Sequence, residues 1–289
     1  MTTSNIYIVS TARTPMGSMQ GAFSTVTAAE LGAVAIESAL KKGGVSPESV
    51  DEVFMGNVLM AGQGQAPARQ AALGAGIAQA TPCTTLNKMC GSGLQALMTA
   101  CDTLKAGRGD VIVAGGMESM TNAPYLLPKA RGGMRMGHGQ VIDSMMLDGL
   151  TDAYSEGTLM GHFADKTAEK YQFTREDQDA FALESLNRAK KAIEGGAFKA
   201  EIAPVTVKGR KGETVVDTDE APSKAMPEKI PSLRPAFNKD GTVTAANASS
   251  ISDGAAATVL CASEGLKKHG LKPVAKVLGY SSHAHEPEW

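Results

Sequence analysis

The first 120 residues alternate between short apolar runs and longer segments in which apolar residues recur every three or four positions. Short runs are typical of buried strands, and the longer spacing is typical of amphipathic helices. With Gly, Pro and capping residues as boundaries, we expect strands at 5–11, 50–59, 84–87 and 110–119, and helices at 27–44, 66–76 and from 91 onward. This alternation predicts an α/β fold with a mostly parallel sheet covered by helices.

The pattern changes between residues 122 and 243, where 123–140 is rich in Gly, Pro and basic residues. A helix is predicted at 174–196, because Thr174 begins a T-x-x-D cap and two glycines end it. Its expected buried stripe is Ala182, Leu186, Ala189 and Ile193. A hairpin at 202–216 and a Pro-rich linker follow.

The α/β pattern returns at 247–263 and again at 273–284. We therefore predict one α/β domain formed by 1–121 and 244–272, with 122–243 as an inserted loop domain. Residues 273–289 are expected to begin a further domain.

Composition limits the classes of function. The net charge of −2 gives no general attraction to nucleic acid or to anionic lipid. No signal peptide and no run of 18 apolar residues is found, so we expect a cytoplasmic protein without a membrane partner. Four scattered cysteines are too few for a disulfide framework and are interpreted as reduced thiols.

Cys90 is the candidate nucleophile. It follows a short predicted strand and precedes Gly91-Ser92-Gly93, which opens a predicted helix. In an α/β sheet this position lies at the carboxyl end of a strand, where ligands gather. The positive end of a helix favours the thiolate, and glycines leave room for an acyl group beside the sulfur. The pattern indicates covalent acyl transfer.

Other interpretations of this stretch fit less well. None of the five histidines lies in an obvious catalytic setting, and the C-G-S fragment lacks the Cys and the aromatic residue of papain-like proteases. Cys83 and Cys90 lack the paired spacing of a zinc site, so no metal is expected. The glycines are not in a dinucleotide-binding register. Cys83, Cys101 and Cys261 are interpreted as structural.

Four motifs, in order along the chain, resemble the thiolase family from Ile6 to Trp289. They are "NKMCGSGLQA", "GGMESMTNAPYLL", "MRMGHGQVIDSMMLDGLTDAY" and "GTVTAANASSISDGAAA". The resemblance implies a thiolase-like layered fold and a reversible Claisen condensation of two acetyl-CoA, with Cys90 carrying the acyl group as a thioester. It also implies a homotetramer formed through the loop around 134–141. Coenzyme A thioesters are then substrates, and no resident cofactor is expected.

The resemblance further implies a set of residues that contact coenzyme A. These are Leu150, Met160, Phe237, Ala245 and Ser249, with Ser249 expected to bind the pantetheine amide. Lys224 aligns near the nucleotide phosphates, although a solvated lysine is the better interpretation.

Two departures from the family pattern stand out. Many biosynthetic members have a histidine before the Met-Gly pair, where this chain has Leu159, and His162 follows the pair instead. The family's C-terminal histidine, asparagine and second cysteine, which build the base and an oxyanion hole, have no counterpart here. We therefore expect most of the C-terminal half to be absent from this chain and a companion C-terminal polypeptide to supply these groups. The alternatives are a catalytically incomplete fragment that binds acyl-CoA or a partner chain, and a cysteine hydrolase.

Overall fold

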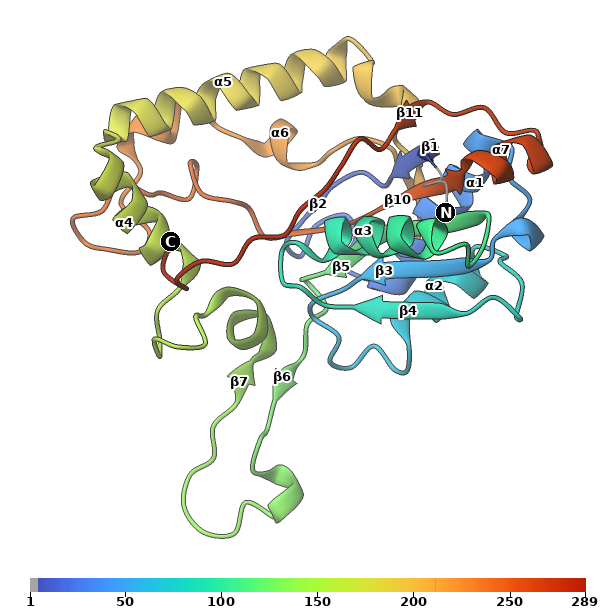
Figure 1. The fold of residues 1–289 in the computed structure, drawn as a ribbon. Coiled ribbons are helices and arrows are strands. Elements are labelled where there is room, and N and C mark those ends of the chain that lie inside the picture. The colour runs from blue at the N-terminus through green and yellow to red at the C-terminus, as the bar shows by residue number, and fades with distance from the viewer. Residues whose placement is uncertain (1–4, 211) are drawn as a thin grey trace. The chain divides into compact units, whose positions relative to one another are not determined.

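The computed structural model describes residues 5–210 and 212–289, and it divides into two compact units (Figure 1). The first contains the chain up to Pro124 together with Lys199–Thr218 and Ser252–Ser281. The second contains Tyr125–Phe198, Asp219–Ile251 and Ser282–Trp289.

The first unit is built on a mixed seven-stranded sheet. Its strands are β1 (Ile6–Arg13), β2 (Gly17–Ser18), β3 (Glu52–Gly56), β4 (Cys83–Leu86), β5 (Val111–Ser119), β10 (Ser252–Ala262) and β11 (Ala275–Lys276). The order is β11-β1-β10-β5-β3-β4, with β2 paired to β10. β3 runs parallel to β4 and β5, whereas β10 lies antiparallel between β1 and β5. The predicted α/β class is confirmed. The sheet is mixed rather than mostly parallel, because β10 lies antiparallel to β1, β2 and β5, and β11 lies antiparallel to β1.

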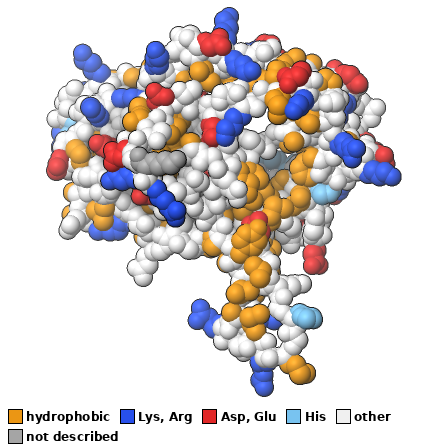
Figure 2. Space-filling view, turned by 180° about the vertical axis from the view of Figure 1, so that it is seen from behind, with side chains coloured by type: hydrophobic (Ala, Val, Ile, Leu, Met, Phe, Trp, Pro, Cys, Tyr) orange, Lys and Arg blue, Asp and Glu red, His pale blue; other side chains and the backbone are white. Residues whose placement is uncertain are grey.

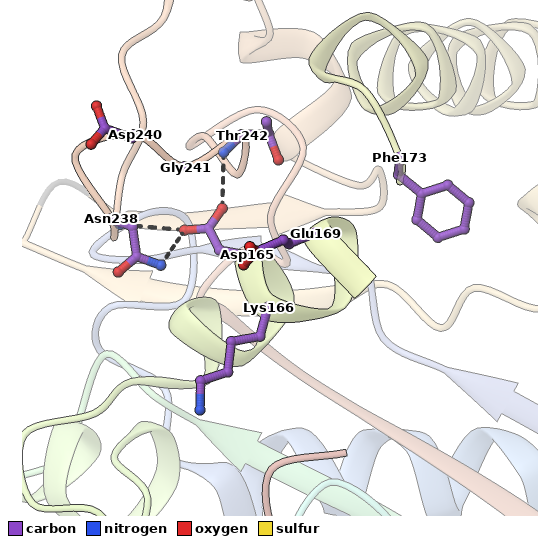
Figure 3. A pocket seen from close by; sticks show the side chains of 8 residues that line it. All are labelled: Asp165, Lys166, Glu169, Phe173, Asn238, Asp240, Gly241 and Thr242. Carbon is purple, nitrogen blue, oxygen red and sulfur yellow. Dashed lines mark hydrogen bonds between the residues drawn. The ribbon is translucent and has the colours of Figure 1, made fainter. Parts of the chain in front are cut away.

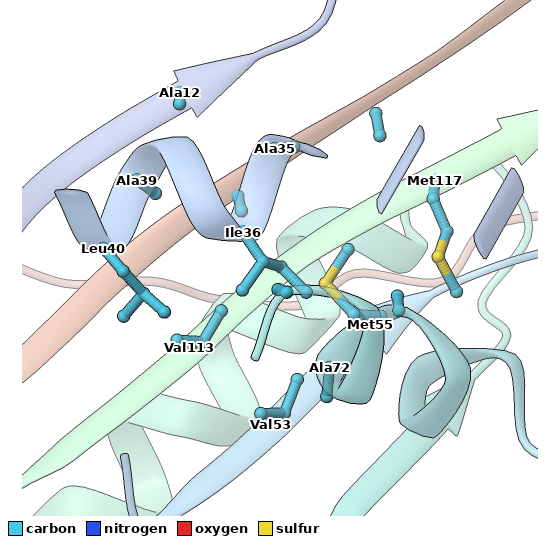
Figure 4. Packing of buried hydrophobic residues seen from close by; sticks show 14 of the residues in the cluster. Ala12, Ala35, Ile36, Ala39, Leu40, Val53, Met55, Ala72, Val113 and Met117 are labelled. Atoms are coloured by element: carbon cyan, nitrogen blue, oxygen red, sulfur yellow. The ribbon is translucent and has the colours of Figure 1, made fainter. Parts of the chain in front are cut away.

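Helices cover both faces of this sheet. α1 (Ala28–Gly43) and α2 (Pro67–Gly74) pack on one face, and α3 (Ser92–Lys105) packs on the other (Figure 1). Alternate residues of β5 show the two faces, because Val111 and Val113 join the α1–α2 cluster while Ile112 and Ala114 join the α3 cluster. Figure 4 shows the first cluster, in which side chains of α1 interdigitate with those of β3 and β5. α7 (Ser263–His269) follows β10.

Helix α1 begins and ends at the residues that its sequence predicts. The Thr27 hydroxyl accepts the Glu30 N–H at 3.2 Å, and the Glu30 carboxylate accepts the Thr27 N–H at 2.8 Å. This reciprocal capping box satisfies backbone donors that the first turn leaves unpaired. Gly44 ends the helix with a φ of 63°, a conformation that glycine adopts without steric cost.

The hairpin of β8 (Val205–Gly209) and β9 (Gly212–Val216) belongs to the first unit. Arg13 links the segment before it to β1, since its N–H donates to Glu201 O at 3.0 Å and its carbonyl accepts the Ala203 N–H at 2.7 Å. Its guanidinium also pairs with the Glu201 carboxylate at 2.7 Å. The domain boundaries predicted at 122, 244 and 273 stay predictions.

The second unit is mainly helical. It contains β6 (Tyr125–Leu126) paired with β7 (Ile142–Asp143), a π-helical turn (Met146–Leu150), α4 (Met160–Tyr171), α5 (Arg175–Glu194) and α6 (Ala221–Lys224). Single 3₁₀ turns across the two units lie at Pro47–Ser49, Ala130–Gly132, Ala197–Ala200 and Pro227–Ser232. Among the described residues, no helix combines the length and apolar character needed to cross a bilayer.

The prediction of a buried stripe on α5 overstates how far its side chains are buried. Ala182, Leu186, Ala189 and Ile193 are partly covered, but no residue of the helix is fully buried. The periodicity identified the more covered face correctly. The second unit, however, has no large sheet of its own against which a helix of 20 residues could bury its side chains.

Residues 125–143 form a long, narrow arm between β6 and β7 (Figure 1). Hydrophobic side chains are exposed along it, and Figure 2 shows them as an orange stripe. They include Tyr125, Leu127, Met134, Met136 and Val141, of which Met136 is 99% exposed. An exposed apolar run of this kind is typical of a surface that contacts another protein.

Candidate active site

Cys90 lies in the tight turn between the carboxyl end of β4 and the first residue of α3. Its thiol is exposed. Met89, directly before it, has a φ of 48°, a left-handed conformation that is uncommon for a residue with a side chain. The predicted position at the carboxyl edge of the sheet is confirmed. Backbone strain next to an exposed thiol is a feature that clusters at functional sites.

The turn is held by its own polar side chains. The Ser92 hydroxyl, which is buried, donates to Met89 O at 2.5 Å and accepts the Lys88 N–H at 2.8 Å. The Asn87 side-chain oxygen accepts the Met89 N–H at 2.8 Å. These bonds stabilise the strained conformation at Met89, so the sulfur of Cys90 is presented on an ordered turn rather than on a mobile loop.

Glycines around the turn serve the packing of α3 against the sheet. A Cβ at Gly56, the last residue of β3, would lie 2.6 Å from two carbon atoms of Ser92. A Cβ at Gly93 would face Gly115 at 3.9 Å. A side chain on Gly93 would therefore point toward the sheet, and the expectation that the glycines after Cys90 leave room for an acyl group stays a prediction. The periodic sequence could not show on which side of the helix this glycine lies.

The other three thiols differ from Cys90 in burial. Cys101 and Cys261 are buried and Cys83 is partly buried. Burial raises the pKa of the thiols of Cys83 and Cys101, and it raises that of Cys261 to about 12, with the nearby carboxylates Asp110 and Asp51 adding to this shift. A thiol with a raised pKa is a weak nucleophile near neutral pH, which agrees with a structural role for all three.

Sequence reasoning missed a half-buried carboxyl at the same edge of the sheet. Glu118, near the end of β5, accepts the N–H groups of Val58 at 2.8 Å and Leu59 at 3.2 Å, and an amide proton of Asn57 at 2.8 Å. Burial raises its pKa, and the three hydrogen bonds oppose that rise. Glu118 thus holds the chain that leaves β3 directly after Gly56. The acid in the otherwise apolar "VIVAGGMES" was the available signal.

All five residues expected to contact coenzyme A lie in the second unit. Leu150 and Met160 are brought close by an antiparallel bridge between their neighbours Thr151 and Leu159. A hydrogen bond from the Asp152 N–H to Thr158 O at 2.8 Å extends this contact. The end of the π-helical turn is thereby joined to the start of α4.

Phe237 packs against the same end of α4. Its ring lies where a side chain on Gly161 would be, and it meets the His162 ring edge to face at 5.7 Å between centroids. The imidazole Nδ1 of His162 accepts the Leu159 N–H at 3.1 Å, so it caps α4 through that nitrogen. The histidine that departs from the family pattern therefore supports Phe237.

Ala245 lies in a turn that is closed by a bond from the Ala248 N–H to Thr244 O at 3.0 Å, and Ser249 directly follows this turn. Both are exposed. Lys224 is also exposed and forms an ion pair with Glu220, as a solvated lysine would. Within the described residues, no group of three or more His, Cys, Asp or Glu side chains could hold a metal ion.

Comparison with known proteins places this geometry in a family. Residues 6–264 match the family model "Thiolase, N-terminal domain". The chain is 51% identical over 288 residues to acetyl-CoA acetyltransferase 2 of Arabidopsis thaliana, covering 99% of this chain and 71% of that protein. It is 46% identical over 290 residues to an acetyl-CoA acetyltransferase of Schizosaccharomyces pombe, and 49% identical over 291 residues to one of Saccharomyces cerevisiae. The alignments cover 100% and 98% of this chain, and 73% and 72% of those proteins. The chain therefore belongs to the thiolase family.

Proposed function

We propose that this protein transfers acetyl groups between coenzyme A thioesters, as an acetyl-CoA acetyltransferase. One observation carries the proposal: the exposed thiol of Cys90 stands on an ordered, strained turn at the start of α3, in a chain about half identical to enzymes of that name. The start of a helix presents the positive end of its dipole, which favours the negative charge that develops during acyl transfer.

The reaction follows from the chemistry of a thiol and a thioester. The Cys90 sulfur attacks the carbonyl carbon of acetyl-CoA, a new carbon–sulfur bond forms, and CoA leaves as its thiolate. The enolate carbon of a second acetyl-CoA then attacks the acyl-enzyme, which forms acetoacetyl-CoA and releases the Cys90 thiolate. Thiolysis is the reverse sequence. Coenzyme A thioesters act as substrates, with no resident cofactor.

The contacts of the ligand are also proposed. Leu150, Met160 and Phe237 would form an apolar wall for the pantetheine arm, supported by the bridge at Thr151 and by the packing of Phe237 on α4. Ala245, on an exposed turn, and Ser249, exposed directly after that turn, would complete it, with the Ser249 hydroxyl bonding a pantetheine amide. Lys224 has no part in this proposal.

The base that removes the α-proton of the second acetyl-CoA is proposed to come from a companion C-terminal polypeptide. Exposed apolar side chains in the first unit support this. Leu94 of α3 is 71% exposed, Val274 is 71% exposed and Leu278 is 92% exposed. Such residues suit a covered interface better than a solvated surface. We further propose a homotetramer through the arm around Met134–Val141, and a cytoplasmic location.

The test uses acetoacetyl-CoA plus CoA, with loss of the enolate absorbance as the signal. Turnover that disappears in Cys90→Ala and remains in Cys83→Ala is expected. Turnover that survives Cys90→Ala would refute the role of this thiol. CoA binding without any turnover would support the second candidate, a fragment that binds acyl-CoA.

A further inference from the structure

The loop between Phe237 and Val243 is wrapped around a single buried carboxylate. Asp165, in the second turn of α4, is 7% exposed (Figure 3). Its Oδ2 accepts the backbone N–H of Asn238 at 3.3 Å and the side-chain amide of Asn238 at 2.9 Å. Its Oδ1 accepts the N–H groups of Thr242 and Val243, both at 2.9 Å. All four donors belong to one loop.

The loop closes tightly on this carboxylate at Gly241. Ala236 donates its N–H to Val243 O at 2.8 Å, which joins the two ends of the loop. A Cβ on Gly241 would lie 2.6 Å from the carboxyl carbon of Asp165. Gly241 has no left-handed φ, so a glycine is required there by contact with Asp165 rather than by backbone conformation.

Asp165 therefore ties this loop to the helix that carries Met160. Phe237 precedes the clamped residues by one position, and its ring packs on Gly161 and His162, one turn before Asp165 on the same helix. Two contacts, one polar and one aromatic, fix the loop against α4. Removing the polar contact would free the backbone that holds the Phe237 ring in place.

The order continues into the turn of Ala245, which Ser249 directly follows. Asn247 accepts the Thr244 N–H at 2.7 Å through its side-chain oxygen. Its amide donates to Thr242 O at 3.1 Å and to the Asp179 carboxylate of α5 at 3.0 Å. Because Thr242 is also bound by Asp165, the clamped loop and the next turn form one hydrogen-bonded segment from 237 to 248.

We propose that Asp165 is a positioning residue of the coenzyme A site, which holds Phe237 and the turn of Ala245 in register with Met160. This inference rests on the proposed function. Asp165 acts through the loop and does not touch the ligand. Its effect is preorganisation: the segment is ordered before the ligand arrives, so binding does not have to supply that ordering.

The test compares Asp165→Asn with Glu169→Gln. Asparagine has one acceptor oxygen, so two of the four loop donors face an NH₂ group instead. Glu169 lies one turn later on α4, is exposed, and lines the same cavity of about 480 Å³, so its substitution removes the same charge at the same place. The dissociation constant of CoA is measured by calorimetry. We expect it to rise about tenfold or more in Asp165→Asn and to change by less than about twofold in Glu169→Gln.

A second readout separates positioning from general destabilisation. The rate at which iodoacetamide alkylates Cys90 without ligand should be unchanged in Asp165→Asn, since Cys90 belongs to the other compact unit. In a steady-state assay of the active enzyme, KM for acetoacetyl-CoA should rise more than kcat falls. A lower melting temperature with unchanged CoA affinity below it would overturn the inference.

Gly241→Ala is an independent probe, because its added methyl presses on Asp165 while every charge is retained. It should weaken CoA binding in the same direction. CoA affinity unchanged in both Asp165→Asn and Gly241→Ala overturns the inference alone. Absence of CoA binding by the unmodified protein overturns the proposed function and this inference together.

Discussion

Substitution of Gly56 by alanine tests whether the packing of α3 on the sheet places Cys90. The new Cβ would lie 2.6 Å from the carbonyl carbon and the Cβ of Ser92, and 2.8 Å from the nitrogen of Gly93, whereas ordinary contact begins at 3.4 Å. The first turn of α3 therefore has to move by about 0.8 Å, and the neighbours are mostly backbone that cannot rotate away. Overpacking of this kind costs about 1–3 kcal/mol.

Gly93→Ala is the matched control. Its nearest new contact is 3.9 Å, so it adds a methyl to the same interface without a clash. Near the start of a helix, replacing glycine by alanine should leave the free energy of unfolding unchanged or raise it by up to about 0.5 kcal/mol.

Two measurements are made on both variants. Urea unfolding followed by circular dichroism gives stability, and peptide mass spectrometry after brief iodoacetamide treatment gives the alkylation rate of Cys90. Gly56→Ala should lose stability and change the Cys90 rate, and Gly93→Ala should do neither. The reasoning is refuted if Gly56→Ala matches the unmodified protein in both, or if the two variants behave alike.

Three further outcomes are expected. At pH 8, iodoacetamide should modify Cys90 well before Cys261, because the raised pKa of Cys261, about 12, leaves little thiolate there. Comparable labelling of the two cysteines in the folded protein would contradict the assigned burial. Met89→Ile should be less stable than Met89→Gly by about 1–2 kcal/mol in urea unfolding, since a β-branched residue is poorly tolerated at a φ of 48°. Equal urea midpoints for the two variants would show that the turn is not strained. For Glu118, burial raises the pKa in the folded state, so ionisation of this carboxyl opposes folding. The stability of the unmodified protein relative to Glu118→Gln should therefore be greatest below the pKa of the unfolded state and should fall as the pH rises through the pKa of the folded state. A constant stability difference between pH 4 and 8 in thermal unfolding would contradict this sign.

Local patterns in the sequence were sufficient for much of the first unit. The capping box at Thr27 and Glu30, the left-handed Gly44 and the apolar runs at β3 and β5 each depend on residues close together in the chain. The position of Cys90 between β4 and α3 follows from the same local signals. The thiolase motifs added the candidate ligand contacts, because their order along the chain is itself sequence information.

Contacts between distant residues were decided only by the tertiary structure. β10 enters between β1 and β5 after more than a hundred intervening residues, which no local period encodes. The same holds for Gly93 facing the sheet and for Glu118 binding the chain after β3. In the sequence, Asp165 lies more than 70 residues before the loop that supplies its four donors. A buried carboxylate is stable only when its partners surround it, and those partners meet only once the chain has folded.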